Sequence, residues 1–466
     1  MDERTADFVQ VFRTFLDEVV HSHRLGQAPD ENGLTAVLQA HLGVDPATLP
    51  VVTEDAPPHL FVNLDIALAE VQARSPEHQL VGVGGGDQRR HQSLSEILEG
   101  ARRYGQFPIA AVDYRSIATG PDDARQAVSF GLRLFTFDGT PVVVLQRAPE
   151  PQYGSPGARM EVLTPADGVA ARLISTVRAV MLERSVFRRQ VLSLGHSDFE
   201  AGIGGITFHR RPALSSADLV LPAGVLDRVR RHVEGVARHR ERLLAAGQHL
   251  KRGLLLHGPP GTGKTHTVRY LLGALPDLTV ILLAGPSIQF VTEAAQMARA
   301  LQPALVVLED CDLVAEDRDM HSGSQPLLFA VLEALDGLSD DADVAFLLTT
   351  NRVDVLEPAL AQRPGRIDLA VEVPLPDEPA RRRLITLYAR NLPFTPAALD
   401  RAAALAQGTT ASFAKELVRR AVLIAADADR DCADPDLDQA LTEMLSESQA
   451  ITRALLGTAE IDPDYP

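Results

Sequence analysis

Hydrophobic residues recur along the chain with two different spacings, which predict helices and strands in alternation. The stretch "TADFVQVFRTFLDEVV" (5–20) has apolar residues at helical spacing, and "PADGVAARLISTVRAVMLERSVF" (165–187) has a second such stripe. Between them lie short runs rich in β-forming residues, at 80–83, 107–114 and 140–146. These elements predict a separate N-terminal α/β or α+β domain over residues 1–200.

Two features of this N-terminal part could carry chemistry. The glycine-rich stretch 82–88 follows a predicted strand, but it lacks the G-x-G-x-x-G spacing of a dinucleotide site, so a turn or loop is favoured. His21 and His23 could touch a metal, but no further ligand has a suitable spacing, and a solvated helix end is favoured. The sequence therefore predicts no catalytic site before residue 200.

A Gly-, Ser- and Pro-rich stretch over 201–217 predicts a linker. A long helical pattern follows at 223–247, and from there short β runs alternate with helices. Such alternation is typical of a parallel sheet with helical crossovers.

A phosphate-binding loop follows the strand "LLLH" and opens a helix. It has the spacing Gly258-x-x-x-x-Gly263-Lys264-Thr265. Glycines let such a loop wrap its N–H groups around phosphates, while Lys264 reaches the β- and γ-phosphates and Thr265 ligates Mg²⁺. We therefore predict ATP and Mg²⁺ as ligands. The residues expected to bind nucleotide here are Gly258, Pro259, Pro260, Gly261, Thr262, Gly263, Lys264, Thr265 and His266.

Two further strands end in polar residues that fit the same site. The stretch "LVVLEDCD" (305–312) delivers Glu309 and Asp310, and in phosphate-loop enzymes such an acid joins the Mg²⁺ shell. The strand "VAFLLTT" ends at Asn351, an amide placed to orient the attacking water. In "RPGRID", Arg363 and Arg366 are candidates for stabilising charge on the γ-phosphate.

Composition and charge narrow the class of protein. The chain has 466 residues, 45% of them hydrophobic, and a net charge of −17, which argues against nonspecific binding to nucleic acid. No apolar run approaches the length that spans a bilayer, and the acidic start does not resemble a signal peptide. The two cysteines, Cys311 and Cys432, fit a reducing cytoplasm, where we expect the protein to reside. Cys311 is expected to pack rather than to act as a nucleophile.

In this order the motifs resemble the AAA branch of the AAA+ ATPases, over residues about 216 to 445. The resemblance rests on "GPPGTGKT", "LVVLEDCD", "TTN" and "TNRVDVLEPALAQRPGRID". It implies a five-stranded αβα nucleotide domain over 218–374, a helical lid over 375–446, and a tail over 447–466. It also implies a ring, usually of six subunits, in which Arg363 and Arg366 act on ATP held by the neighbouring subunit. Such arginine fingers contribute a rate factor on the order of 10³–10⁵.

Smaller correspondences extend the resemblance to the adenine side. "ADLVLP" matches the family's adenine-contacting linker, which would place Asp218 and Leu219 near the base. Tyr388 matches a lid position on the same side, and Ala411 matches the lid segment near the second sensor.

The chain departs from the family pattern at positions that affect ATP turnover and the threading of polypeptide through the ring. Most members have Asp then Glu where this chain has Glu309 then Asp310; by position, Glu309 takes the Mg²⁺ role and Asp310 activates water. The same order resembles the mitochondrial AAA translocase of the folded Rieske subunit, so it is compatible with a working, slow ATPase. The segment that carries a pore aromatic is shortened, and Phe290 is either that aromatic or a core residue. One extra residue precedes "RPGR", which favours Arg366 over Arg363 as the finger.

The predicted function is an oligomeric ATPase that remodels a protein partner recognised by its N-terminal domain. One alternative is a nucleotide-gated assembly or scaffold with little turnover. A nucleic-acid motor is a third option, which the acidic balance disfavours. The absence of H-E-x-x-H excludes the membrane-bound protease relatives as a functional match.

Overall fold

The structure is a computed structural model, and its chain divides into two compact units. It describes residues 12, 14, 15, 33–151, 155–196, 203–312, 333, 334, 337, 339–353 and 367–455. Unit 1 comprises residues 1–186 and 198–204, and unit 2 comprises residues 187–197 and 205–466. Most of the predicted helix 5–20, together with His21 and His23, lies outside the described residues.

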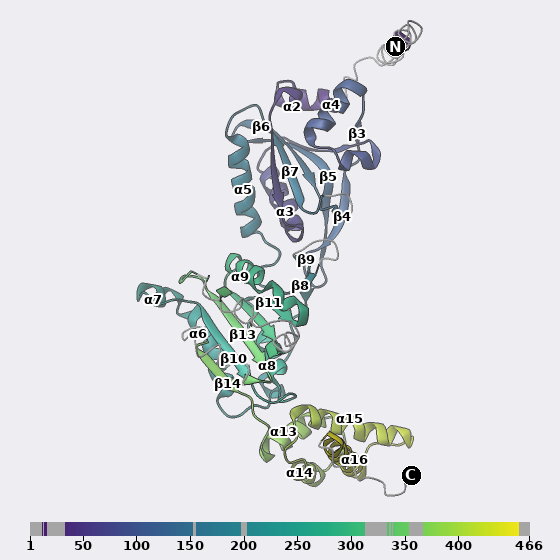
Figure 1. The fold of residues 1–466 in the computed structure, drawn as a ribbon, viewed down its shortest axis with the longest axis vertical. Helices are drawn as coiled ribbons and strands as arrows, with labels where there is room; N and C mark the ends of the chain where they lie inside the picture. The colour runs from purple at the N-terminus through teal and green to yellow at the C-terminus, as the bar shows by residue number, and fades with distance from the viewer. Residues whose placement is uncertain are drawn as a thin grey trace, which may run out of the picture. The chain divides into compact units, whose positions relative to one another are not determined.

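Unit 1 is an antiparallel sheet covered by helices on both faces (Figure 1). Its strand order is β1-β7-β6-β5-β2-β3, and β4 also pairs with β5. The expected α/β or α+β domain is therefore of the α+β kind. The strands are β1 (Val51–Ala56), β2 (His78–Val83), β3 (Ile109–Ala110), β4 (Asp113–Ala118), β5 (Ala124–Phe137), β6 (Thr140–Arg147) and β7 (Ala158–Leu163).

Four helices bury the two faces of this sheet. Helices α3 (Phe61–Ala73) and α5 (Val169–Glu183) share one core with Val142 and Val144 of β6. Helices α2 (Leu34–Leu42) and α4 (Leu94–Tyr104) share the other core with Val143 and Leu145. Since side chains alternate along a strand, β6 contributes to both cores and is apolar from Val142 to Leu145.

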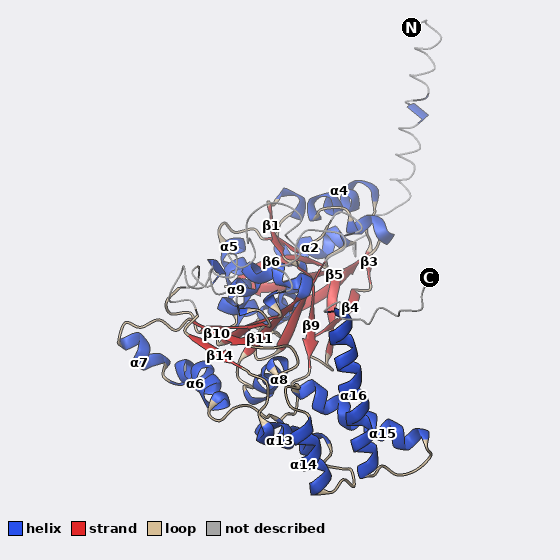
Figure 2. Cartoon of the chain, turned by 60° about the horizontal axis from the view of Figure 1, so that its bottom comes forward, coloured by secondary structure: helices blue, strands red, loops and turns tan. Residues whose placement is uncertain are grey.

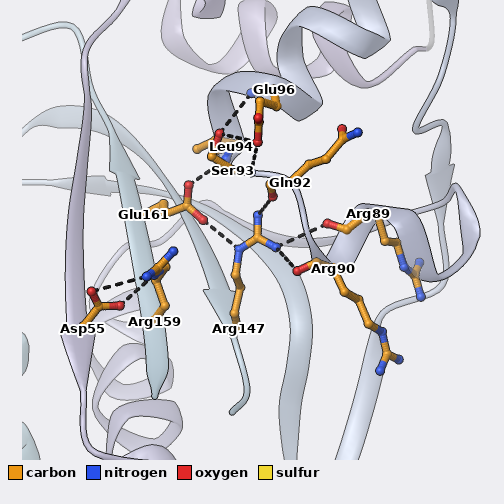
Figure 3. A network of polar contacts seen from close by, with 10 residues as sticks. All are labelled: Asp55, Arg89, Arg90, Gln92, Ser93, Leu94, Glu96, Arg147, Arg159 and Glu161. Carbon is orange, nitrogen blue, oxygen red and sulfur yellow. Dashed lines mark hydrogen bonds and ion pairs between the residues drawn. The ribbon is translucent and has the colours of Figure 1, made fainter. Parts of the chain in front are cut away.

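A buried arginine ties the glycine-rich loop of unit 1 to this sheet (Figure 3). Arg147 donates to the Glu161 carboxylate at 2.7 Å, and to the backbone carbonyl oxygens of Arg89, Arg90 and Gln92. The loop continues as the short helix η3 (Gly86–Arg90), in agreement with the turn predicted over 82–88. These bonds satisfy a guanidinium that would be costly to bury alone, so the cluster has a structural explanation.

Unit 2 contains a second sheet, of order β14-β10-β13-β12-β11-β8-β9. From β14 to β8 every neighbouring pair is parallel. Helix α8 (Lys264–Ala274) and helix α6 (Val225–Arg238) share a core with one face, while α9 (Val291–Ala300) packs against β11 and β12. The strands are β8 (Val191–His196), β9 (Ile203–His209), β10 (Arg252–His257), β11 (Thr279–Ala284), β12 (Ala304–Glu309), β13 (Val344–Thr350) and β14 (Leu369–Glu372).

The linker expected over 201–217 is in part a strand. Strand β9 occupies residues 203–209 and lies beside β8 at the edge of the sheet, although its glycines suggested a linker. Pairing with a neighbouring strand overrides the weak β preference of glycine. The five strands β10 to β14 thus form the expected nucleotide-domain sheet, and β8 and β9 extend it. The short helix α7 (Arg240–Ala245) follows α6.

The C-terminal part of unit 2 is helical (Figure 2). It comprises α13 (Glu378–Tyr388), α14 (Pro396–Leu405), α15 (Ala411–Asp427) and α16 (Asp434–Leu455), which share one core of mainly Ala and Leu side chains. Asp377, Thr395 and Thr410 cap the first three helices by accepting a hydrogen bond from the backbone. A helical lid was expected here over 375–446, but α16 continues to Leu455, into the stretch predicted as a tail. None of the helices in the described part of the chain is long and apolar enough to cross a membrane.

Candidate functional site

A cavity of about 440 Å³ lies between the phosphate-binding loop and the lid. Its walls come from the loop, from the residues after η5 (Ser216–Asp218), from the ends of β12 and β13, and from helices α13 and α15. The predicted site residues among its lining are Asp218, Leu219, Pro260, Gly261, Thr262, Gly263, Lys264, Thr265, His266, Asp310, Asn351, Tyr388 and Ala411. Residues more than 190 positions apart thus converge on one space.

Two glycines of the loop are required by close approaches. A Cβ atom on Gly258, whose φ is +142°, would lie 2.3 Å from the carbonyl oxygen of Val373. Gly261 has a φ of +75°, and a Cβ there would meet the hydroxyl oxygens of Thr410 and Ser412 at 3.0 Å. Gly258 therefore lets the loop leave β10 against the chain after β14, and Gly261 lets the lid approach the loop.

The lid is bonded directly to the loop. The backbone N–H of Ser412 donates to the carbonyl oxygen of Gly261 at 3.1 Å, and the Ser412 hydroxyl donates to the same oxygen at 3.4 Å. Ser412 stands in the first turn of α15, so the start of this lid helix is held against the loop.

Lys264 begins α8 and is buried in the loop. Its Nζ donates to the carbonyl oxygens of Gly258 at 2.8 Å and Pro259 at 2.9 Å. Burial lowers the pKa of the Lys264 ammonium, and the nearby Asp310 and Asp312 carboxylates oppose that change. An ammonium held this way is in place to meet phosphate oxygens at the start of a helix.

Glu309 ends β12 with one carboxylate oxygen unsatisfied. Its Oε1 is enclosed and has no hydrogen-bond partner among the described residues. Burial raises the pKa of Glu309, as does the charge of Asp310, whereas a hydrogen bond from Thr265 and the charge of Arg269 lower it. An enclosed carboxylate oxygen beside a Thr hydroxyl is a suitable ligand pair for Mg²⁺, which binds oxygen and takes further ligands from phosphates and water. The residues present therefore fit the ion.

Asp310 is turned into the cavity by an unusual backbone. Its φ is +52°, in the left-handed region, which Asp tolerates better than most residues. Its N–H donates to the Thr349 hydroxyl at 3.0 Å, which ties this turn to β13. The next residue, Cys311, is partly buried as a whole, and the burial of its thiol raises the pKa of that group to about 12, in keeping with packing rather than nucleophilic attack.

The amide of Asn351 is held by a carboxylate that the motif analysis did not assign. Asp312 is 5% exposed; its Oδ1 accepts from the Thr350 hydroxyl and the Asn351 N–H, both at 3.1 Å. Its Oδ2 accepts from the Asn351 side-chain nitrogen at 3.3 Å. Asp312 thus joins the ends of β12 and β13 and orients Asn351.

The residues predicted to lie near adenine all line this cavity, but the contacts of their side chains differ. Leu219 is buried, and burial raises the pKa of the Tyr388 hydroxyl. Asp218 accepts from the N–H and hydroxyl of Ser215 at 2.9 and 2.8 Å, which holds the pKa of Asp218 below its usual range. Its contact with a base stays a prediction.

Some predicted site residues are not among those that line this cavity. Arg363 and Arg366 fall outside the described residues. Gly258 and Pro259 shape the loop but are not among the lining residues of the cavity, and Glu309 lines a neighbouring cavity. Phe290 is 5% exposed, so of the two readings of this aromatic the core residue is the one observed.

Two basic residues of the cavity were not predicted. Arg269, on α8, and Lys415, on α15, both line it. A cation four positions past Thr265 of the loop, or one turn into a predicted lid helix, carries no motif that would distinguish it from a surface charge. Only the fold shows that they face the same space.

Comparisons with known proteins agree with this geometry. Residues 254–375 match the family described as "ATPase family associated with various cellular activities (AAA)". The chain carries an AAA ATPase module. The matched span runs from β10 to the chain after β14 and includes the loop, Glu309, Asp310 and Asn351.

Curated relatives belong to the same group of ATPases. The chain is 30% identical over 292 residues to ATP-dependent zinc metalloprotease FtsH 3 of Sphaerobacter thermophilus, covering 59% of this chain and 58% of that protein. It is 29% identical over 213 residues to 26S protease regulatory subunit 6A of Caenorhabditis elegans, covering 42% and 48%. It is 31% identical over 318 residues to FtsH 1 of Symbiobacterium thermophilum, covering 62% and 52%. The chain therefore spans about half the length of these relatives.

Proposed function

We propose that the protein binds and hydrolyses ATP in the cavity between the phosphate-binding loop and the lid. The convergence of Lys264, Asp310 and Asn351 on this one cavity carries the proposal. The lysine supplies positive charge for phosphates, and we assign the carboxylate and the amide, which line the same cavity, to the attacking water.

Each side chain has a defined part in the proposed reaction. Lys264 leaves the carbonyl oxygens of Gly258 and Pro259 and binds the β- and γ-phosphates. Asp310 accepts the proton of the attacking water, and Asn351, oriented by Asp312, positions that water. Glu309 and Thr265 would hold Mg²⁺, and the ion would supply positive charge against the phosphate oxygens.

The site needs a further cation that we assign to a neighbouring subunit. We propose that Arg366, with Arg363 as second candidate, reaches ATP bound by the adjacent copy of the chain in a homo-oligomeric ring. Similarity to the AAA family supports the ring. A lone monomer would then turn over ATP slowly, because an arginine finger contributes on the order of 10³–10⁵ in rate.

We further propose that ATP turnover remodels a protein partner bound by unit 1, in the cytoplasm. The names of the relatives, an ATP-dependent protease and a regulatory subunit of the 26S protease, associate similar modules with work on proteins. Unit 1 is a separately packed domain with two cores of its own, which suits a recognition role.

Steady-state ATP hydrolysis at increasing protein concentration tests the proposal. The rate per subunit is expected to rise with concentration as subunits assemble, and Asp310→Asn should abolish it while ADP still binds. Asp438→Asn is a matched control, because Asp438 pairs with Arg401 on the surface of the lid. A rate per subunit that stays at the level of Asp310→Asn, with nucleotide still bound, would instead support a nucleotide-gated scaffold.

A further inference from the structure

A second cavity, of about 450 Å³, has Glu309 in its wall and matches the nucleotide cavity in size. It is open to solvent and is lined by the edge strands β8 and β9, by the end of β11, and by the short helix η6 (Gly285–Phe290). Strands β8 and β9 extend the sheet beyond the five strands of the nucleotide domain, so this wall is additional to the ATP site.

Most polar groups on its walls already have partners. Ser193 Oγ lies 2.7 Å from Nε2 of His209, which links β8 to β9. The Ser287 hydroxyl accepts from the N–H of Ala284 and donates to its carbonyl oxygen. The Gln289 amide is exposed, so Glu309 Oε1 is the buried polar atom of these walls that has no partner among the described residues.

The rest of the lining determines what could satisfy this oxygen. Leu194, Leu282 and Phe290 are apolar, and neither Lys nor Arg is among the residues that line the cavity. An occupant must therefore carry its own hydrogen-bond donor and should be apolar behind it. Lys and Arg side chains have this form, with an apolar stem and a cationic head.

We propose that this second cavity binds a basic side chain of a polypeptide, with the cationic head against the Glu309 carboxylate and the stem against Leu194, Leu282 and Phe290. A charge-assisted hydrogen bond to an enclosed carboxylate is among the stronger polar contacts in proteins. The bound side chain also removes a buried acceptor that is costly to leave unpaired.

The same carboxylate couples this cavity to ATP turnover, an effect that rests on the proposed function. Glu309 interacts with Thr265 of the phosphate loop and carries the oxygen that fits Mg²⁺. A cation on Glu309 competes with Mg²⁺ for that oxygen. Occupancy of the second cavity therefore slows hydrolysis until the basic side chain leaves.

Binding can be measured without any turnover. Calorimetric titration of the nucleotide-free full-length protein would compare two probes, Nα-acetyl-arginine amide and its citrulline analogue, which is nearly isosteric and uncharged. The arginine probe is expected to bind about tenfold more tightly, the size of one charge-assisted hydrogen bond. Glu309→Gln should remove the difference. Equal affinities in the wild-type protein overturn the proposal.

Cavity variants separate this site from the ATP site. Ser193→Ala leaves the space open and should keep the arginine probe within about threefold, whereas Ser193→Phe fills the space and should abolish binding. Ala284→Leu, on another wall, should do the same if Ser193→Phe fails to fold. Unchanged ADP affinity shows that a variant is intact. Undiminished binding of the probe to both filling variants places it elsewhere and contradicts the proposal.

Coupling is tested by hydrolysis at varied Mg²⁺. The arginine probe should raise the Mg²⁺ concentration for half-maximal rate about threefold or more, the citrulline probe should not, and Ser193→Phe should be insensitive to both. If the protein hydrolyses no ATP even without probe, the proposed function fails while probe binding still stands or falls by calorimetry. If hydrolysis is normal and neither probe changes the Mg²⁺ dependence, the coupling is wrong.

Discussion

Asp312 accepts two hydrogen bonds from Asn351, one from its backbone N–H at 3.1 Å and one from its side-chain nitrogen at 3.3 Å. Asp312 lies two residues after Asp310, and Asn351 lies at the end of the neighbouring strand β13. The acid that would activate water and the amide that would position it are therefore held in register by a third side chain. A carboxylate with two oxygens can fix both the backbone and the side chain of the same residue.

Replacing Asp312 should lower turnover more than nucleotide affinity. In Asp312→Asn, the side-chain NH₂ faces the Asn351 NH₂ or its N–H, so one of the two bonds is lost. We expect kcat to fall about tenfold to a hundredfold while the Kd for ADP changes less than about threefold. Steady-state kinetics and ADP titration measure the two quantities. Asp277→Asn, which removes the same charge outside the lining of the cavity, is the control. A parallel loss of ADP affinity and kcat would mean that Asp312 only maintains the fold.

Lys415 should contribute to nucleotide affinity from the lid. It lines the cavity from α15, whose start is bonded to the loop at Gly261. Because Lys415 is exposed, its attraction for phosphate is screened by salt, and Lys415→Met should weaken ATP binding about threefold to tenfold at low ionic strength and less at high. Lys415→Arg should retain the affinity. Arg419→Met is the matched control, since Arg419 pairs with Glu416 on the same helix. An affinity for ATP that Lys415→Met leaves unchanged at low salt contradicts this role.

The site residues that the sequence predicted each lie within a short, continuous motif. Gly258 to Thr265 form one loop, and Glu309, Asp310 and Asn351 each end a strand, so strand direction alone brings them to one edge of the sheet. Asp312 and Lys415 were missed because each reaches the site through contacts between segments that are distant in sequence. Asp312 meets Asn351 39 positions further on, and Ser412 meets Gly261 151 positions away.

In unit 1, too, the sequence predicted the elements that are defined by their own residues and missed one that depends on distant contacts. Strand β6 and helix α5 were predicted because their apolar residues alone define them. The 14-residue strand β5 was missed. Its pattern is interrupted by Arg133, which is buried because it donates to Asp65 at 2.7 Å and Gln146 at 2.8 Å. A charged residue predicts exposure unless its partners are known, and Asp65 is 68 positions away.

Glu309 should make the nucleotide-free protein less stable as pH rises. The folded state raises the pKa of Glu309, so it retains this proton at pH values where the unfolded chain has released it. Stability from this group is therefore present at low pH and is lost as pH rises from the ordinary Glu value of 4.5 through the folded pKa. Glu309→Gln should accordingly stabilise the nucleotide-free protein at pH 7, by about 1 kcal/mol, and less toward pH 4.5.

Chemical denaturation of both proteins across this pH window measures the difference. Adding Mg²⁺ and ADP should reverse the order at pH 7, because only the wild-type protein gains a carboxylate ligand for the ion. Equal stability of the two proteins at all pH values would show that the unpaired oxygen of Glu309 carries no penalty.

Breaking the buried ion pair between Arg252 and Asp343 should strongly destabilise unit 2. The two groups lie 2.8 Å apart, with side chains 2% and 4% exposed, and Arg252 also donates to the carbonyl oxygens of Val233 and Leu250. Asp343→Ala leaves a buried, unpaired guanidinium and should cost about 3–5 kcal/mol of unfolding free energy. The exposed pair Arg382 and Asp400 offers the control: Asp400→Ala should cost less than about 1 kcal/mol. Similar losses in the two variants would contradict this assignment.

Mixing two inactive variants tests whether Arg366 acts between subunits. A Lys264→Ala subunit lacks its own phosphate-binding ammonium but can still supply Arg366 to the site of its neighbour. An Arg366→Ala subunit keeps Lys264 but supplies no arginine to its neighbour. If the finger acts on the neighbour's ATP, random co-assembly creates complete sites wherever an Arg366→Ala subunit receives the finger of a Lys264→Ala subunit. About a quarter of all sites meet this condition in an equal mixture, and hydrolysis should recover to about that fraction of the wild-type rate. The double variant mixed with itself stays inactive in either case. A mixture that remains as inactive as its components would show that Arg366 serves its own subunit or none, and Arg363 would then be tested in the same way.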